Sequence, residues 1–223
     1  MAVTLPHIPG YEQTRVYDAI RENLWIHFTQ MAEFSDPATR PTVIVRGEGS
    51  TIWDDQGNEL LDGLAGLYSV NAGYGRREIV DAMVAQLEQI PFVNGFAFAS
   101  VPAAVLADRL GELAPLGGNA RVFFTSGGSE AVETALKLAK QYQSNRGFSN
   151  RYKTISRRGA YHGTTMGALS VNGVTSIKGA FGPLVPGARH VEMSNAYRSD
   201  DDGFEAIEKL VEFEGPESIA AII

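Results

Sequence analysis

Residues 122–129 read Val-Phe-Phe-Thr-Ser-Gly-Gly-Ser, and this stretch decides the fold. Its first half, residues 122–125, is a continuous apolar run. Such a run predicts a strand that is buried on both faces, as the strands of a parallel sheet are. Ser and Gly break the strand at residues 126–129, and residues 130–142 have the pattern of a helix. A strand, a glycine turn and a helix in this order predict an α/β unit.

The pattern continues on both sides of this stretch. Downstream, residues 152–157 and 218–223 read as strands and residues 204–213 as a helix, so strands alternate with helical crossovers and the sheet is expected to be mostly parallel. Upstream, three short strands with a turn at Asp55-Gln-Gly-Asn58 predict a small antiparallel meander. The strands of this meander are residues 43–45, 51–53 and 59–62. Helices are expected at residues 16–31, at residues 76–89 and after Pro102.

The domain organisation follows from these elements. Residues 1–75 are predicted to form an N-terminal segment and a small-domain meander, and residues 76–223 the first part of a larger α/β domain. The strand at residues 218–223 has no residue after it, although chain termini usually lie at the surface. We therefore expect a chain truncated inside the large domain, the N-terminal part of a longer protein.

Composition excludes several function classes. The 223 residues hold 26 acidic and 19 basic side chains, for a net charge of −7, whereas a general nucleic-acid binder is normally basic. The chain has no cysteine, which excludes disulfides and thiolate metal sites and fits a cytoplasmic protein. No apolar run approaches about 18 residues, so no membrane span is expected.

The charge is unevenly distributed. Residues 134–191 contain no Asp or Glu but nine Lys and Arg side chains. A local positive field inside an acidic protein suits a small anionic ligand, although a solvated basic face has the same pattern.

The glycine turn before this stretch is a device for binding an anion. Gly127 and Gly128 let the backbone turn sharply, and the first N–H groups of the helix have no partner inside it. Ser129 adds a hydroxyl donor, or it simply caps a tight turn. A Walker-type loop and a G-x-G-x-x-G motif are both absent, and no acid lies about 20 residues on to hold a ribose. A compact phosphorylated cofactor therefore fits better than NAD.

A second loop, Tyr161-His-Gly163, follows the strand at residues 152–157. Ligands of open parallel sheets bind at the carboxyl ends of strands, so Tyr161 could lie against a heteroaromatic ring and His162 could make a polar contact. The alternative for Tyr161 is packing alone. A metal site at His162 is not expected, because no second ligand residue lies at a suitable spacing.

Four motifs together resemble those of one family. Phe124-Thr-Ser-Gly-Gly-Ser-Glu-Ala131 with Glu133-Thr-Ala-Leu-Lys-Leu-Ala139 is similar to the phosphate loop and helix of class III aminotransferases, and Tyr161-His-Gly-Thr-Thr165 to their ring-stacking loop. The segment from Asp62 to Gly75 resembles the substrate-pocket segment of the ω-aminotransferase branch. Arg46-Gly-Glu-Gly49 and Trp53-Asp-Asp-Gln-Gly-Asn58 are similar to the N-terminal meander. The resemblance covers nearly the whole chain.

The resemblance implies fold type I (aspartate aminotransferase-like) and pyridoxal 5'-phosphate (PLP) as cofactor. It implies that Gly127, Gly128 and Ser129 hold the phosphate, that Tyr161 stacks on the ring and that His162 lies beside it. Four further residues would line the substrate pocket: Phe28, Leu67, Tyr68 and Phe96. Related ω-aminotransferases often have Trp where Tyr68 stands. The resemblance also implies a homodimer with the site at its interface, and amino transfer from an amine or ω-amino acid to a 2-oxo acid such as pyruvate.

No catalytic residue is expected within these 223 residues. PLP chemistry needs a lysine that forms a Schiff base, and none of the five lysines matches the family's position. That lysine is expected after Ile223, so this chain alone should be inactive. The alternatives are a fragment or paralogue that binds cofactor or a partner without turnover, a PLP racemase or mutase, and a nucleotide-binding oxidoreductase.

Overall fold

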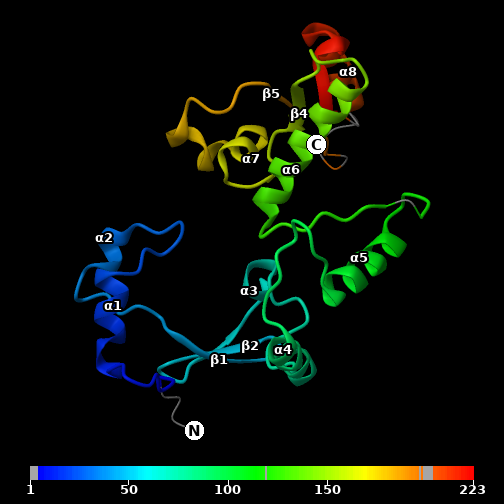
Figure 1. The fold of residues 1–223 in the computed structure, drawn as a ribbon. Coiled ribbons are helices and arrows are strands. Elements are labelled where there is room, and N and C mark those ends of the chain that lie inside the picture. The colour runs from blue at the N-terminus through cyan, green and yellow to red at the C-terminus, as the bar shows by residue number, and fades with distance from the viewer. Residues whose placement is uncertain (1–4, 119, 196, 198–202) are drawn as a thin grey trace. The chain divides into compact units, whose positions relative to one another are not determined.

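The computed structural model describes residues 5–118, 120–195, 197 and 203–223. The chain forms two compact units, Met1–Val101 and Pro102–Ile223 (Figure 1). The domain division that we predict after residue 75 falls inside the first unit. The assignment of residues 1–75 and 76–223 to different domains stays a prediction.

The first unit contains the expected antiparallel meander. Its strands are β1 (Ile44–Glu48), β2 (Thr51–Asp54) and β3 (Glu59–Leu61), in the order β1-β2-β3. Asp54 closes the turn between β2 and β3, since its Oδ1 accepts hydrogen bonds from the N–H groups of Gln56 and Asn58 at 2.9 and 2.8 Å. The amphipathic helix α4 (Arg77–Gln89) also forms as expected.

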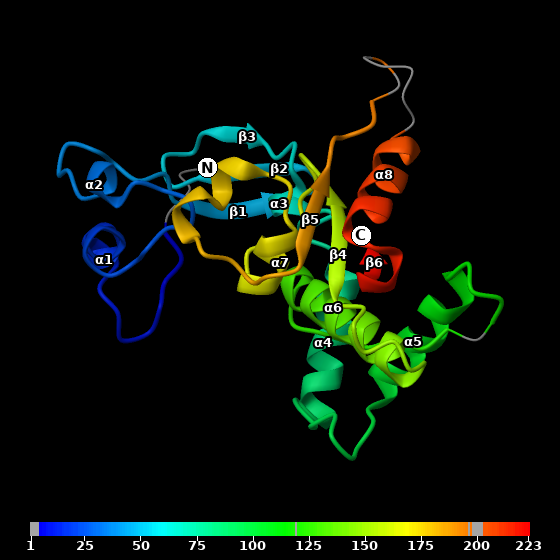
Figure 2. The ribbon, with the colours of Figure 1, turned by 90° about the horizontal axis from the view of Figure 1, so that it is seen from above.

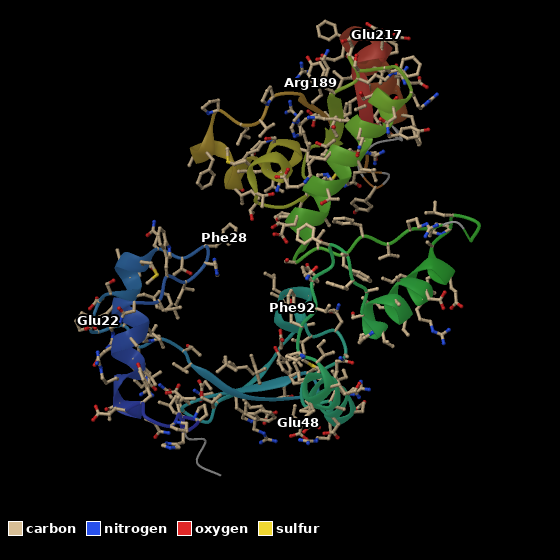
Figure 3. The ribbon with its side chains drawn as sticks, viewed as in Figure 1. Glu22, Phe28, Glu48, Phe92, Arg189 and Glu217 are labelled. Carbon is tan, nitrogen blue, oxygen red and sulfur yellow. The ribbon has the colours of Figure 1, made fainter. Side chains whose placement is uncertain are left out.

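The helix expected at residues 16–31 is broken into two short pieces. Helix α1 (Val16–Glu22) ends where the N–H groups of both Asn23 and Leu24 bond to the carbonyl of Ala19. The chain resumes helical structure only at α2 (Met31–Phe34). Phe28, in the connection between them, has a φ of 53° and is largely exposed (Figure 3). A left-handed residue cannot lie within a right-handed helix, so no single helix runs through position 28, although α1 already ends at Glu22.

A left-handed turn follows the meander. All four residues of α3 (Ala65–Tyr68) have positive φ, between 49° and 65°. This region costs an L-residue roughly 1–2 kcal/mol, so the turn needs external support. Asp62 supplies it, since its Oδ2 accepts from the Gly66 N–H at 2.7 Å and from the Tyr74 hydroxyl at 2.8 Å, and its Oδ1 from the Leu64 N–H at 3.1 Å.

The second unit is built on a parallel sheet. Its strands are β4 (Lys153–Arg157), β5 (Ala188–Val191) and β6 (Ile219–Ile222), and Figure 2 shows β4 between the other two. The helices are α5 (Val101–Leu113), α6 (Gly128–Asn145), α7 (Met166–Val171) and α8 (Phe204–Glu214). The small antiparallel meander and the parallel sheet with helical crossovers confirm the predicted α/β class.

The two faces of this sheet carry different packing. Ile155 of β4 and Val191 of β5 form a buried cluster with Ile207 of α8. Because side chains alternate along a strand, the neighbours of Ile155 face the other way. There the fully buried Ser156 donates a hydrogen bond to the Val171 carbonyl of α7 at 2.6 Å. Helix α7 and helix α8 therefore cover opposite faces of β4.

One predicted strand does not form, and one strand of the structure was not predicted. Residues 122–125 form no strand, because none of the backbone hydrogen bonds among the described residues involves them. Phe123 and Phe124 are accordingly exposed rather than buried. Strand β5, with Arg189 and His190 at its centre, was not expected, because it is short and half polar.

Candidate functional site

The start of α6 presents free backbone donors. Gly127 precedes the helix in an extended conformation, and Ala131 is the first residue whose N–H bonds to the Gly127 carbonyl. The N–H groups of the preceding three residues thus have no partner within the helix. Apart from the adjoining residues and the backbone of α6, no described atom lies within 4 Å of the position that a Cβ would take on Gly127 or on Gly128. The turn has open space beside both glycines, where an anion would meet backbone N–H groups and the positive end of the helix dipole.

Ser129 connects this turn to the second predicted loop. Its Oγ accepts a hydrogen bond from the N–H of Thr164 at 3.0 Å. Its own hydroxyl hydrogen therefore stays available for an acceptor such as a phosphate oxygen. The structure thus brings the glycine turn and the segment that begins at Tyr161 together.

Tyr161 and His162 differ in exposure. Tyr161 is 63% exposed, so a ligand can reach its side chain. The Nε2 atom of His162 is buried, and it has no hydrogen-bond partner among the described residues. Burial also lowers the pKa of His162 below its ordinary value, which keeps the ring neutral at pH 7. A buried polar atom without a partner is rare, and a polar group of a ligand could satisfy it.

Glu133 is a functional candidate that sequence reasoning missed. It lies on α6 one turn after Ser129, and its Oε1 accepts hydrogen bonds from Thr165 Oγ1, the Gly167 N–H and the Ala168 N–H. The only signal in the sequence is its place as the last acid before the acid-free stretch, and that pattern equally fits a solvent-facing side chain.

The buried Asn172 was also missed. Its Nδ2 donates to the Gly163 carbonyl at 2.9 Å, and its Oδ1 accepts from the Val174 N–H at 2.8 Å. Its own carbonyl accepts from Lys178 Nζ at 2.6 Å and lies 3.1 Å from His190 Nε2. Burial is the main cause that lowers the pKa values of both Lys178 and His190.

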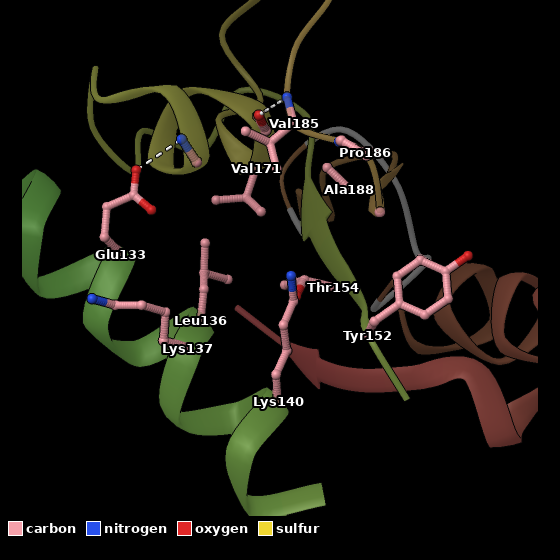
Figure 4. Close-up of a pocket in the computed structure, with 13 residues that line it drawn as sticks. Glu133, Leu136, Lys137, Lys140, Tyr152, Thr154, Val171, Val185, Pro186 and Ala188 are labelled. Atoms are coloured by element: carbon pink, nitrogen blue, oxygen red, sulfur yellow. Dashed lines mark hydrogen bonds between the residues drawn. The ribbon is translucent and has the colours of Figure 1, made fainter. Parts of the chain in front are cut away.

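A small cavity lies between α6, α7 and the sheet, with a volume of about 80 Å³. Figure 4 shows Glu133 at one end, reaching from α6 toward α7, and Lys140 pointing from α6 toward Thr154 of β4. Lys137 also lines the cavity, and its ammonium group points to the side away from Lys140 in the same view. The cavity is partly lined by Glu133, so it borders the α6–α7 contact.

Three of the five lysines are bonded to other groups, and the other two lie beyond the first turn of α6. Lys153 Nζ pairs with Glu214 at 2.7 Å, and Lys209 Nζ pairs with Glu205 one turn away on α8 at 2.5 Å. Lys178 bonds to Asn172, as above. Lys137 and Lys140 lie two and three turns into α6.

The four residues expected in a substrate pocket all belong to the first unit. They are exposed, with fractions of 69% or more: Phe28, Leu67, Tyr68 and Phe96. Three of them, Phe28, Leu67 and Tyr68, have positive φ. Backbone strain of this kind collects at functional sites, which is compatible with the expected pocket.

Metal and membrane signals are absent from the described part of the chain. Among its His, Asp and Glu residues, no group of three or more could hold a metal ion. None of its helices is both long enough and apolar enough to cross a bilayer.

Comparison with known proteins gives consistent matches. A family model described as "Aminotransferase class-III" matches residues 34–223. The chain is 44% identical over 209 residues to a probable aminotransferase of Mycobacterium tuberculosis, covering 90% of the chain and 44% of that protein. It is 34% identical over 222 residues to the putrescine–pyruvate aminotransferase of Pseudomonas aeruginosa, covering 95% of the chain and 48% of that protein.

Solved structures agree with these relatives. An (S)-enantioselective ω-transaminase of Thermomicrobium roseum superposes with a TM-score of 0.85 at 40% identity, covering 94% of this chain and 48% of that one. The ω-transaminase of Pseudomonas jessenii, solved in complex with PMP, gives a TM-score of 0.86 at 30% identity, covering 93% and 48%. The chain spans about half the length of the relatives it matches.

Proposed function

Because the chain belongs to the class III aminotransferases, we propose that the protein carrying it transfers an amino group from an amine or ω-amino acid to a 2-oxo acid such as pyruvate. The chain has the fold of PLP-dependent transferases of type I. One observation carries the proposal: the free N-terminus of α6 at Gly127–Ser129 is bonded, through Ser129 and Thr164, to the segment that presents Tyr161.

Class III aminotransferases depend on PLP, and the residues present fit this cofactor. The turn at Gly127 and Gly128 has open space where side chains would stand, with unpaired N–H groups around it. His162 has a buried Nε2 without a partner among the described residues. When bound, PLP supplies an electron sink that makes amino transfer feasible.

Each residue then has a defined task. The backbone N–H groups at Gly127 and Gly128 would donate hydrogen bonds to the phosphate, and Ser129 would donate its hydroxyl hydrogen to a phosphate oxygen. The exposed face of Tyr161 would stack on the ring and fix its plane. The neutral His162 would offer a hydrogen bond without adding charge. Together these contacts would orient the cofactor and exclude water from one side of it.

The reactive lysine is expected outside residues 1–223, in the part of the relatives' length that this chain does not span. Three of its five lysines bond to other groups, and two lie along α6 beyond its first turn. A lysine that moves a proton must reach the reacting atoms directly, which supports this assignment.

The amine substrate is proposed from the relatives. Named relatives act on putrescine and on taurine, each with pyruvate as the partner substrate. We propose that Phe28, Leu67, Tyr68 and Phe96 line the amine pocket here. Tyr68 is smaller than the Trp common at this position, so the pocket would differ in shape.

Absorbance spectroscopy of the full-length protein tests the proposal. Bound PLP should give an absorption band that disappears on addition of an amine donor and returns with pyruvate. The variant Ser144→Ala, at an exposed position far along α6, serves as a control and should behave like the wild type. A protein that binds no PLP, or a band that does not respond to amine, would contradict the proposal.

The remaining expectations stay proposals with their own tests. A homodimer that completes the site at its interface should be visible as twice the protomer mass in light scattering. Cytoplasmic location is tested by cell fractionation. Racemase or mutase activity would release products without consuming a 2-oxo acid, so the stoichiometry of pyruvate consumption separates these reactions from transamination.

A further inference from the structure

Two side chains one turn apart on α6 fasten the segment that follows Tyr161. Ser129 Oγ accepts from the Thr164 N–H at 3.0 Å. Glu133 Oε1 accepts from Thr165 Oγ1 and from the Gly167 N–H at 2.7 Å each, and from the Ala168 N–H at 3.1 Å. Figure 4 shows the Glu133 carboxylate reaching across to the start of α7. Four hydrogen bonds therefore join two segments more than 30 residues apart.

Two glycines make this close contact feasible, and they have the same spacing as their partners. A Cβ on Gly163 would lie 2.9 Å from Ser129 Cα, and a Cβ on Gly167 would lie 2.8 Å from Glu133 Cδ. Positions 129 and 133 thus face positions 163 and 167. Gly163 also has a φ of 123°, a conformation that favours glycine.

This contact stabilises the negative charge of the Glu133 carboxylate. Burial by itself would raise the pKa of Glu133, but the hydrogen bonds from Thr165, Ala168 and Gly167 and the nearby charge of Lys137 lower it overall. The carboxylate is therefore ionised at neutral pH, and its bonds are charge-assisted and stronger than neutral ones.

The same segment is held from its other side. The buried Asn172 donates to the Gly163 carbonyl at 2.9 Å. Gly163 is therefore fixed between Ser129 and Asn172, while Glu133 fixes the chain just beyond it. Tyr161 and His162 directly precede Gly163, so their backbone is attached to a position that is held in place.

We propose that Glu133 is a positioning residue that sets the distance between the phosphate loop and the Tyr161 ring. This inference rests on the proposed function, in which the cofactor is bound at two grips: the phosphate loop at Gly127–Ser129 and the ring of Tyr161. A cofactor that bridges two grips binds well only when their separation matches its length, and displacements of about 1 Å have large effects on bound geometry. Glu133 touches neither grip and acts by joining them.

The variant Glu133→Ala in the full-length protein tests this role. Apparent dissociation constants are measured for PLP by fluorescence titration and for inorganic phosphate by thermal shift. PLP contacts both grips, whereas inorganic phosphate contacts only the loop at Gly127–Ser129. We expect PLP binding to weaken roughly tenfold and phosphate binding to change less than about twofold. Glu208→Ala, at an exposed position on α8, is the matched control and should change neither.

A double-mutant cycle identifies the route of the effect. If Glu133 acts through Tyr161, the loss caused by Glu133→Ala should nearly vanish in a Tyr161→Ala background. At saturating PLP, the circular dichroism of the bound cofactor should also be weaker in Glu133→Ala than in the wild type, because the ring is held less firmly.

Two further variants guard against simple misfolding. Glu133→Gln keeps an acceptor oxygen but loses the charge, so its PLP affinity should lie between those of the wild type and Glu133→Ala. Gly167→Ala leaves Glu133 in place but inserts a methyl group against its carboxylate, and should reproduce the Glu133→Ala pattern. Alanine is otherwise favourable in a helix, so a loss here points to the contact itself.

The outcomes separate this inference from the proposed function. Equal losses for PLP and phosphate, an unchanged loss in the Tyr161→Ala background, or wild-type affinity in Glu133→Ala would each overturn the positioning role while leaving a PLP enzyme. Failure of the wild-type protein to bind PLP would overturn both.

Discussion

Ser129 has two hydrogen-bonding tasks in the proposed site. Its oxygen accepts from the Thr164 N–H, and its hydrogen is free for a phosphate oxygen. Ser129→Ala removes both, and hydrogen bonds to charged groups contribute about 1.5–3 kcal/mol. We expect PLP affinity to fall roughly ten- to hundredfold in fluorescence titrations. Ser144→Ala on the same helix should bind PLP as the wild type does, and an equal loss in both variants would indicate general damage to α6.

Gly163→Ala should destabilise the fold. Its φ of 123° is unfavourable for alanine, and the added Cβ would lie 2.9 Å from Ser129 Cα. Strained backbone positions of this kind cost about 1–3 kcal/mol, to be measured by urea unfolding. Gly111→Ala in α5 is the control with the opposite sign. No described atom lies within 4 Å of its Cβ position, so alanine should stabilise by about 0.5–1 kcal/mol. A Gly163→Ala protein as stable as the wild type would refute the close approach.

The sequence made some site residues readable and not others, for a physical reason. Gly127, Gly128 and Ser129 are contiguous, so their chemistry can be recognised locally. Glu133 acquires its role only through Thr165, Gly167 and Ala168, which are 32 to 35 positions away. Spacing within α6 predicts which face Glu133 occupies but not what packs against that face.

At the scale of elements, helix α8 is tied to the sheet by one carboxylate. Glu214, the last residue of α8, pairs with Arg189 of β5 and with Lys153 of β4, the latter at 2.7 Å. Hydrogen bonds from Arg189 and then from Lys153 lower the pKa of Glu214 from its ordinary 4.5 to about 2. These pairs join three elements that lie far apart in the sequence.

The pH dependence of stability should report this network. A group whose pKa is lower in the folded state stabilises the fold above its ordinary pKa and loses that contribution as the pH falls. We expect Glu214→Gln to lower the urea midpoint at pH 7, and the difference from the wild type to shrink as the pH falls from 4.5 toward 2. Glu212→Gln, at an exposed position on α8, should show no such window. A pH-independent difference would exclude the ion pairs as its cause.

Most elements with a clear apolar pattern were predictable, including the short strands of the meander, but two short segments were not. Helices α4 and α6 formed close to their expected bounds, because many turns repeat the same pattern. Strand β5 has four residues with Arg189 and His190 in the middle, and its place depends on hydrogen bonds to β4. Residues 122–125 have the composition of a strand, but the described chain supplies no neighbour to pair with them.

At the scale of the whole molecule, the uneven charge has a structural explanation. The acid-free residues 134–191 receive counter-charges from residues that follow them. Arg158 pairs with Glu192 at 3.2 Å, and Lys153 and Arg189 both pair with Glu214. Three of the nine basic side chains of this stretch therefore have a carboxylate partner within the second unit.

Residues 1–223 expressed alone should show no transaminase turnover. Their lysines are bonded elsewhere or lie along α6, as described above. A coupled assay for pyruvate consumption, run in parallel on the full-length protein, checks this. Turnover by residues 1–223 would mean that one of the five lysines is reactive, and substitution of each by Arg would then identify it.

The left-handed turn at Ala65–Tyr68 limits which mutations the proposed pocket tolerates. Side chains branched at Cβ are the least tolerant of positive φ, whereas Gly and Asn accept it. A saturation library at Leu67 and Tyr68 should therefore lose Val, Ile and Thr among folded variants whatever amine is used for selection. Sequencing of the soluble fraction before any activity screen tests this. Variants that broaden the substrate range should carry unbranched or aromatic side chains. The backbone conformation therefore limits the allowed residues before any selection for activity.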